Sequence, residues 1–326
     1  MQPASLPPDA LSPIAVSISN VYALPLASGV ALIDCGPPFA GAWEQLVDGL
    51  RARGHSPADV TWVLLTHSHL DHSGLAYRLR EHGARIAVHA AEAEQLARPG
   101  QHSYRENAHR LLLAEGVPED VAEQGLRALF GGHARTAARP RFDVPPALSP
   151  HLLLEDDHAL SGLGVPLRAL HTPGHSSGST CFYDEGNAAL FSGDALFPTM
   201  AHSPPMEFSA SGERLRTMGA MLASLERLHR LGGRLLLPGH GPAGAGVAQA
   251  VERTRRHHER HAERLLRALG VEWLSAHGLL RRLYPHLQPG SLWPAMSDVL
   301  GHLDLLADRR LIRAGRQGAA TVYGRV

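Results

Sequence analysis

The chain has 326 residues, of which 44% are hydrophobic, and its formal net charge is zero. This length allows one large domain plus a small one, and the balanced charge argues against a protein that binds polyanions over its whole surface. The two cysteines, Cys35 and Cys181, are too few for a disulfide framework. No run approaches the ~20 apolar residues of a membrane helix, and the N-terminal residues lack the apolar core of a signal peptide. We therefore expect a cytoplasmic protein with no membrane partner.

Short apolar runs recur through the first 240 residues and predict strands with one or both faces buried. They are Val30 to Ile33, Val60 to Leu65, Arg85 to Val88, Pro166 to Leu170, Thr180 to Tyr183, Ala188 to Phe191 and Arg234 to Leu237. Helices are predicted between them at Ala40 to Arg53, Leu70 to His82 and Gly212 to Leu231. Strands that alternate with helices favour an α/β domain over this part of the chain.

Two segments depart from this alternation of strands and helices. Arg105 to Glu115 and Pro118 to Phe130 predict two helices followed by a proline-rich loop, and we interpret about residues 90–150 as a helical insertion over one edge of the sheet domain. After a charged helix, the C-terminal segment predicts helix, helix and hairpin, with the hairpin at Leu311 to Val326. This order suits a small winged-helix-like module. The predicted domains are therefore residues 1–245 and 246–326.

The stretch from Thr66 to His72 carries the densest functional signal, because three imidazoles and one carboxylate lie within six residues. An extended backbone would point His67 and His69 to the same side, and Asp71 and His72 would follow at the start of a helix. Neutral imidazole and carboxylate are ligands for borderline divalent ions such as zinc. The spacing can serve two ions, one by each pair.

Three further candidates each follow a predicted strand and lie beside glycine: His175, Asp194 and His240. A neighbouring glycine lets the backbone approach closely where a Cβ atom would block it. Together with the first cluster, these side chains supply three ligands for each of two ions plus one shared carboxylate. Catalytic zinc keeps about three protein ligands and an open position, so the sequence predicts a dinuclear metal centre.

These motifs, in this order, resemble the metallo-β-lactamase fold superfamily over roughly Ile14 to Pro242. A fifth motif, Leu32-Ile33-Asp34-Cys35-Gly36, resembles the early turn of that family, whose aspartate supports the ligands through hydrogen bonds. The resemblance implies an α+β fold, a four-layer αββα sandwich with the metal site between its two sheets. By resemblance, one ion is held by His67, His69 and His175, the other by Asp71, His72 and His240, and Asp194 bridges them.

The resemblance also implies a reaction. It implies two divalent ions, with zinc as the first expectation and manganese or iron as alternatives. These ions would generate a bridging hydroxide that attacks a carbonyl carbon or a phosphorus atom. The catalytic residues would be Asp71 and Asp194. The chain looks most like the glyoxalase-II-like and endoribonuclease-like branch that carries a winged-helix-like tail.

Three hypotheses follow for the substrate. The first is a hydrolase of a small-molecule ester, thioester or lactone. The second is an endoribonuclease acting on single-stranded RNA, because from residue 250 onward thirteen arginines stand against seven acidic residues. The third is a nucleic-acid-binding protein with a structural metal site, which fits least well because structural zinc sites need no second ion. A homodimer is left open.

Several other polar residues are expected to have no role in chemistry. The His257-His258-x-x-His261 run is expected on a solvated face of the charged helix. His171 is expected to support a ligand or pack. Tyr104, Asn107 and His109 are expected to serve packing or the surface of the insertion rather than to line a substrate pocket.

Overall fold

The computed structural model describes residues 6–98, 103–130 and 145–326, and the chain divides into two compact units. Unit 1 comprises residues 1–100, 140–201 and 223–252, and unit 2 comprises residues 101–139, 202–222 and 253–326. The predicted domains, 1–245 and 246–326, divide the chain differently, because the helices of the predicted insertion share a core with the C-terminal segment. In the part of the chain that is described, no helix combines the length and apolarity needed to cross a membrane.

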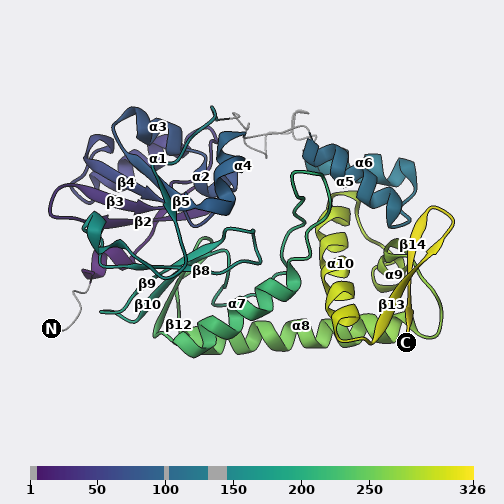
Figure 1. Cartoon of the computed structure of the whole chain (residues 1–326). Coiled ribbons are helices and arrows are strands. Elements are labelled where there is room, and N and C mark those ends of the chain that lie inside the picture. Colours follow the sequence, from purple (N-terminus) through teal and green to yellow (C-terminus); the bar gives the residue numbers. More distant parts are fainter. Residues whose placement is uncertain (1–5, 99–102, 131–144) are drawn as a thin grey trace. The chain divides into compact units, whose positions relative to one another are not determined.

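Within the described residues, unit 1 contains two six-stranded sheets (Figure 1). The first sheet has the order β1-β2-β3-β4-β5-β6. Its strands are β1 (Ile14–Val16), β2 (Ser19–Pro25), β3 (Val30–Ile33), β4 (Val60–Leu64), β5 (Arg85–His89) and β6 (Leu152–Leu154). Pairing is antiparallel from β1 to β3 and parallel from β3 to β6.

The second sheet has the order β12-β11-β10-β9-β8-β7. Its strands are β7 (His158–Ala159), β8 (Arg168–His171), β9 (Thr180–Asp184), β10 (Ala189–Gly193), β11 (Leu235–Pro238) and β12 (Gly244–Ala245). The pair β10 and β11 is parallel, and the other neighbours are antiparallel. All seven predicted strands are confirmed, whereas β1, β2, β6, β7 and β12 were not predicted from the sequence.

Successive side chains of a strand point to opposite faces of its sheet, and this alternation defines the layers of unit 1. In β3, Val30 and Leu32 face a core shared with the helices, and Ala31 and Ile33 face the core between the two sheets. The helices on the outer side of the first sheet are α1 (Ala42–Arg51) and α3 (Ala76–Glu81), and the short helices α2 (Leu70–Ser73) and α4 (Ala93–Ala97) lie beside its strand ends (Figure 1). The outer side of the second sheet carries α7 (Met218–Leu231) and the start of α8 (Val247–Leu269). These layers form the predicted αββα sandwich.

Unit 2 is built mainly from helices around one apolar core. Its elements are α5 (Ser103–Ala114), α6 (Glu119–Phe130), the later part of α8, α9 (Ala276–Leu283), α10 (Leu292–Asp308) and the hairpin of β13 (Ile312–Gln317) and β14 (Ala320–Arg325). The order helix, helix, hairpin is confirmed at the C-terminus, and its classification as a winged helix stays a prediction. Helices α5 and α6, predicted to lie over an edge of the sheet domain, instead pack into this core. The proline-rich loop predicted after them lies mostly outside the described residues.

The expectation for the histidine run on α8 is wrong. His258 is 1% exposed, because it lies on the same stripe of α8 as the buried residues Val251, Thr254, Ala262 and Leu265. That stripe faces the core of unit 2 rather than solvent.

Residues of the insertion serve packing, as expected. The hydroxyl of Tyr104 donates to the backbone oxygen of Met206 at 2.8 Å, and its ring meets that of Trp293 edge to face.

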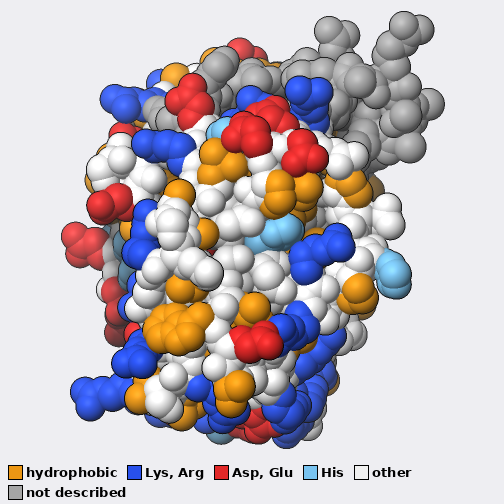
Figure 2. Space-filling view, turned by 90° about the vertical axis from the view of Figure 1, so that its right-hand side faces the viewer, with side chains coloured by type: hydrophobic (Ala, Val, Ile, Leu, Met, Phe, Trp, Pro, Cys, Tyr) orange, Lys and Arg blue, Asp and Glu red, His pale blue; other side chains and the backbone are white. Residues whose placement is uncertain are grey.

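Many arginines of the C-terminal segment from residue 250 onward contact carboxylates or aromatic rings of the protein itself. Arg309 lies 2.7 Å from a carboxylate oxygen of Glu259, Arg282 pairs with Glu272, and the Arg313 guanidinium lies 5.3 Å from the centre of the Trp273 ring. Figure 2 shows basic and acidic side chains interspersed with apolar ones on one face of the molecule. This mixture differs from the clustered basic stripe that is typical of nucleic-acid-binding surfaces.

Replacement of Phe191 by alanine should lower the free energy of unfolding of unit 1 by about 3–5 kcal/mol, because it removes a fully buried ring and leaves a cavity between the sheets. Leu153→Ala is the control, since Leu153 is 47% exposed and its loss should cost less than about 1 kcal/mol. Urea unfolding followed by circular dichroism measures both. Equal losses for the two variants would contradict this assignment of the core.

Candidate metal centre

The seven side chains predicted as ligands come together in unit 1, although four separate segments carry them. The segment from His67 to His72 follows β4, and His175, Asp194 and His240 follow β8, β10 and β11 in turn. Because these strands end at the same side of the sandwich, the loops that follow them converge. Their role as metal ligands stays a prediction, but their convergence is a feature of the structure.

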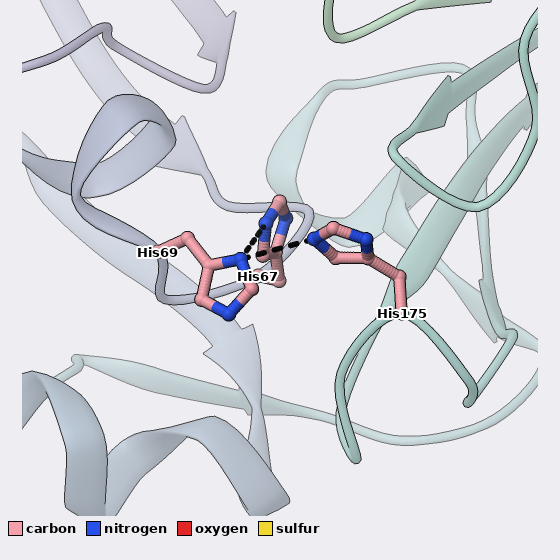
Figure 3. A group of neighbouring side chains, drawn as sticks. All are labelled: His67, His69 and His175. Carbon is pink, nitrogen blue, oxygen red and sulfur yellow. Dashed lines mark hydrogen bonds between the residues drawn. The ribbon is translucent and has the colours of Figure 1, made fainter. Parts of the chain in front are cut away.

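Three imidazoles form the first group (Figure 3). His69 Nδ1 lies 3.0 Å from His67 Nε2 and 3.0 Å from His175 Nε2. A tetrahedral zinc ion with bonds of about 2.0–2.1 Å separates its ligand atoms by roughly 3.3 Å. The spacing of these three nitrogens therefore suits one ion.

Asp71, His72 and His240 form the second group. His240 Nε2 lies 3.1 Å from His72 Nε2 and 3.2 Å from Asp71 Oδ2, and the latter two atoms are 3.8 Å apart. One carboxylate oxygen and two imidazole nitrogens thus surround a second point, with a spacing similar to that of the first group.

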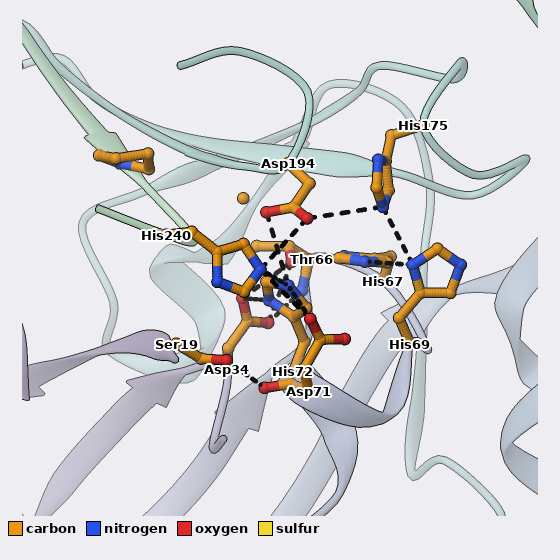
Figure 4. A network of polar contacts seen from close by, with 12 residues as sticks. Ser19, Asp34, Thr66, His67, His69, Asp71, His72, His175, Asp194 and His240 are labelled. Atoms are coloured by element: carbon orange, nitrogen blue, oxygen red, sulfur yellow. Dashed lines mark hydrogen bonds and ion pairs between the residues drawn. The ribbon is translucent and has the colours of Figure 1, made fainter. Parts of the chain in front are cut away.

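Asp194 lies between the two groups (Figure 4). One carboxylate oxygen, Oδ2, is 3.6 Å from His175 Nε2 in the first group and 3.4 Å from His240 Nε2 in the second. The other oxygen, Oδ1, is 3.5 Å from His72 Nε2, is buried, and accepts no hydrogen bond from the described residues. A buried carboxylate in this place has the position that a ligand shared by two cations requires.

Hydrogen bonds behind the imidazoles fix which ring nitrogen faces the site. His72 Nδ1 donates to Asp34 Oδ2 at 2.8 Å, and His240 Nδ1 donates to the backbone oxygen of Ile18 at 2.7 Å. The hydroxyl of Thr66 donates to Asp34 at 2.9 Å and accepts from His67 Nδ1 at 3.0 Å. In all three rings Nε2 is therefore the nitrogen that faces the site, the orientation that second-sphere carboxylates and carbonyls impose on metal-binding histidines. Asp34 has the supporting position that the sequence resemblance implies.

The charges of the site favour cation binding. Burial and the neighbouring imidazoles hold the pKa of His67 well below its ordinary value, so this ring is neutral at pH 7. Burial opposes ionisation of Asp194, but the imidazole of His72 and its other neighbours outweigh it and hold the carboxyl pKa well below its usual range. Burial also opposes protonation of His72, yet Asp194 and Asp34 raise its pKa well above the ordinary value. A bound cation would replace that proton, because metal binding and protonation compete for the same lone pair.

Glycine allows two close approaches at this centre. A Cβ atom on Gly239 would lie 2.6 Å from Asp194 Oδ1 and 2.6 Å from His72 Cε1. A Cβ atom on Gly193, which has a φ of +49°, would lie 2.7 Å from the Cβ atom of Thr66. Both positions therefore need the absence of a side chain.

Sequence reasoning missed a buried carboxylate that links two ligand loops. Glu92 is fully buried in the short 3-10 helix of residues 90–92, and its oxygens accept from the backbone N–H of Ser68 at 3.0 Å and of Gly178 at 2.7 Å. Ser68 lies between two predicted ligands, and Gly178 lies three residues after His175. No sequence signal identified Glu92, because a lone glutamate among alanines is typical of an exposed helix.

Sequence reasoning also missed the residues that hold the loop around His240. Asn20 Nδ2 donates to the backbone oxygens of Pro238 at 2.9 Å and Gly241 at 2.8 Å, and the hydroxyl of Tyr22 donates to Pro238 at 2.9 Å. Both residues belong to β2, which was not predicted. His171 has the supporting place that was expected, because its Nε2 donates to the backbone oxygen of Ser177 at 2.9 Å.

The chain matches a family model and known proteins over most of its length. A model described as "Metallo-beta-lactamase superfamily" matches residues 14–240. The chain is 26% identical over 324 residues to the "Probable metallo-hydrolase YqjP" of Bacillus subtilis strain 168, a match that covers 96% of this chain and 94% of that one. It is also 33% identical over 147 residues to the "Acyl-coenzyme A thioesterase MBLAC2" of Bos taurus, which covers 45% of each chain.

A solved structure shares the same fold. The metallo-beta-lactamase family protein TTHA1429 from Thermus thermophilus aligns with a TM-score of 0.74 and 31% sequence identity, and the alignment covers 97% of both chains. The family match, the similarity to this structure and the convergence of the histidines and aspartates in unit 1 agree. The chain therefore belongs to the metallo-beta-lactamase superfamily and is a metal-dependent hydrolase.

Proposed function

We propose that this protein hydrolyses small thioesters, esters or lactones at a dinuclear centre, and that acyl thioesters are the first substrates to test. The observation that carries this proposal is the position of Asp194 between two groups of ligand-type side chains. His67, His69 and His175 would hold one divalent ion and Asp71, His72 and His240 the other, with Asp194 shared. The short nitrogen–nitrogen and nitrogen–oxygen distances, and the Nε2 atoms of His67, His72 and His240 that face the site, support this fit.

Divalent ions in such a site supply Lewis acidity, which lowers the pKa of water from 15.7 to roughly 7 and polarises a carbonyl oxygen. The protein contributes rigid placement of the donors. Asp34 keeps the His72 ring in one orientation, and the loop that carries His240 is held by Asn20 and Tyr22. Preorganised groups of this kind cost little reorganisation when charge develops during the reaction.

Asp71 is ionised and can offer a carboxylate oxygen to a cation. Burial opposes its ionisation, but the hydrogen bond from His240 and nearby imidazoles lower its pKa to about 2, so it is a carboxylate at neutral pH. Its side chain is 29% exposed, more than that of Asp194 at 9%. So low a pKa makes Asp71 a weak proton acceptor, and we therefore assign it to holding the second ion at the more open side of the site.

Two observations favour a thioester over RNA. The relative from Bos taurus is named as a thioesterase, and its match covers 45% of this chain. The arginines on which an RNA-binding tail would depend are partly engaged, as in the pair of Arg309 with Glu259. A small acyl substrate also needs no extended basic surface.

Asp194→Asn should lower kcat for a medium-chain acyl-coenzyme A by more than about 100-fold, because the amide cannot supply the shared negative charge. Asp48→Asn is the matched control, since the side chain of Asp48 is 70% exposed on α1. Thiol release can be followed by absorbance, with an ester, a lactone and an unstructured RNA measured in parallel. The substrate assignment would be overturned if the wild type cleaved RNA but turned over no thioester, ester or lactone, and if Asp194→Asn lost that RNA cleavage.

Removal of metal should abolish hydrolysis, and one added zinc equivalent should restore less activity than two. The physical reason is that both groups of ligands contribute to the same reaction centre. Activity is measured on chelator-treated protein during stepwise addition of Zn²⁺. Full activity in protein shown to be free of metal by elemental analysis would contradict the proposal.

Glu92→Gln should weaken metal binding and kcat by about 10–100-fold while changing KM little, because Glu92 positions two ligand loops without reaching the site. The amide can accept only one of the two backbone N–H bonds through its oxygen, so the loops lose one anchor. Glu94→Gln, with its side chain 63% exposed two residues later, is the control. If the two variants bind Zn²⁺ with equal affinity in a competition assay, Glu92 has no positioning role.

A further inference from the structure

A second cluster of ligand-type side chains lies in unit 2, on two helices that share its core. His258 and His261 are three residues apart on α8, and Asp298 and His302 are four residues apart on α10. Each pair therefore lies on one face of its helix. Pairs of this kind on facing helices are the arrangement from which helical bundles build metal sites.

The cluster is mostly removed from water. His258 is 1% exposed and His302 is fully buried, while the side chains of His261 and Asp298 are 10% and 20% exposed. Placing three imidazoles and a carboxylate together in a core costs free energy unless their polar atoms find partners. The packing of unit 2 alone does not require polar side chains here.

Three of these side chains bring a ligand-type atom to a common region. His261 Nε2 lies 2.8 Å from Asp298 Oδ2, within the distance of an ion pair. One ligand atom from each of His261, Asp298 and His302 lies within 4.8 Å of the others. Ligand-type atoms gathered within this distance are what the binding of a single ion requires.

Neighbouring groups orient the cluster. His302 Nδ1 contacts the backbone oxygen of Asp298 at 2.7 Å, and His302 Nε2 contacts His258 Nδ1 at 3.1 Å. His258 Nε2 is buried and, among the described residues, has no hydrogen-bond partner. The hydroxyl of Ser203 donates to Asp298 Oδ1, which leaves Oδ2 to face His261.

The charge state agrees with this geometry. Burial and the adjacent imidazoles lower the pKa of His258 to about 3, so its ring is neutral at pH 7. Burial works against ionisation of Asp298, but His261 and His302 outweigh it and hold the pKa of this carboxyl well below its ordinary value. Imidazole with one ionised carboxylate suits zinc and similar divalent ions.

We propose that His261, Asp298 and His302 form a further site for a divalent transition-metal ion, with zinc as the first candidate. The three donors stand on two helices that pack into the apolar core of unit 2, so we assign the ion a structural role. The ion would tie α8 to α10 inside unit 2. It is separate from the reaction proposed for unit 1 and does not depend on it.

The test counts zinc ions bound to the full-length, metal-free protein. Wild type should bind one equivalent more than His261→Gln and one more than Asp298→Asn, and Zn²⁺ should raise the melting temperature less in both variants. His257→Gln, a change at a neighbouring histidine of α8 outside the proposed ligand set, should bind as wild type does. Equal zinc stoichiometry in wild type and in both folded ligand variants would overturn the site.

A measurement on the wild type covers the case in which the variants do not fold. Crystals grown with Zn²⁺ should give an anomalous difference peak among His261, Asp298 and His302. Absence of that peak in crystals whose unit 1 site is loaded would contradict the proposal. Loss of thioesterase activity alone bears on unit 1, so failure of the proposed function and failure of this site are distinguishable.

Discussion

The position of Asp194 is the constraint on which the rest of the candidate site depends. Its carboxylate lies within 3.4–3.6 Å of imidazole nitrogens from three other loops, in a place that is largely closed to water. A buried carboxylate needs positive charge around it, and imidazoles need a proton or a cation to supply that charge. Two divalent ions would satisfy both demands, and the spacing of the remaining donors fits the two proposed ligand shells.

The sandwich supplies the precision that such a site needs. Strands from both sheets end near the same point, and short buried contacts then fix each loop: Asp34 behind His72, Asn20 behind the loop of His240, and Glu92 between two ligand loops. Asn20 belongs to β2 and Glu92 to a short 3-10 helix, and Asp34 directly follows β3. The apolar core between the sheets, with Tyr22 and Phe191 in edge-to-face contact at 5.0 Å, holds the two halves of the site in register.

Most of the candidate site could be predicted from the sequence, because each ligand-type residue belongs to a short motif directly after an apolar run. The residues that hold the loops in place could not be predicted from the sequence. Asn20 and Glu92 bind backbone groups that are in most cases more than fifty residues away, and such contacts leave no local sequence pattern. The histidine run on α8 was misjudged for a related reason. Its charged neighbours are typical of a solvated helix, although the spacing from Val251 through His258 to Leu265 marks a buried stripe. The partnership of α5 and α6 with the C-terminal helices is likewise a long-range contact that helical periodicity cannot reveal.

X-ray absorption spectroscopy of the zinc-loaded protein tests the central claim most directly, because it reports whether a metal ion has a second metal ion as its neighbour. A shared Asp194 predicts a metal–metal feature at about 3.5–4 Å that disappears in Asp194→Asn. Spectra with nitrogen and oxygen ligands but no such feature, in wild-type protein with both ligand groups of unit 1 filled, would contradict a dinuclear centre.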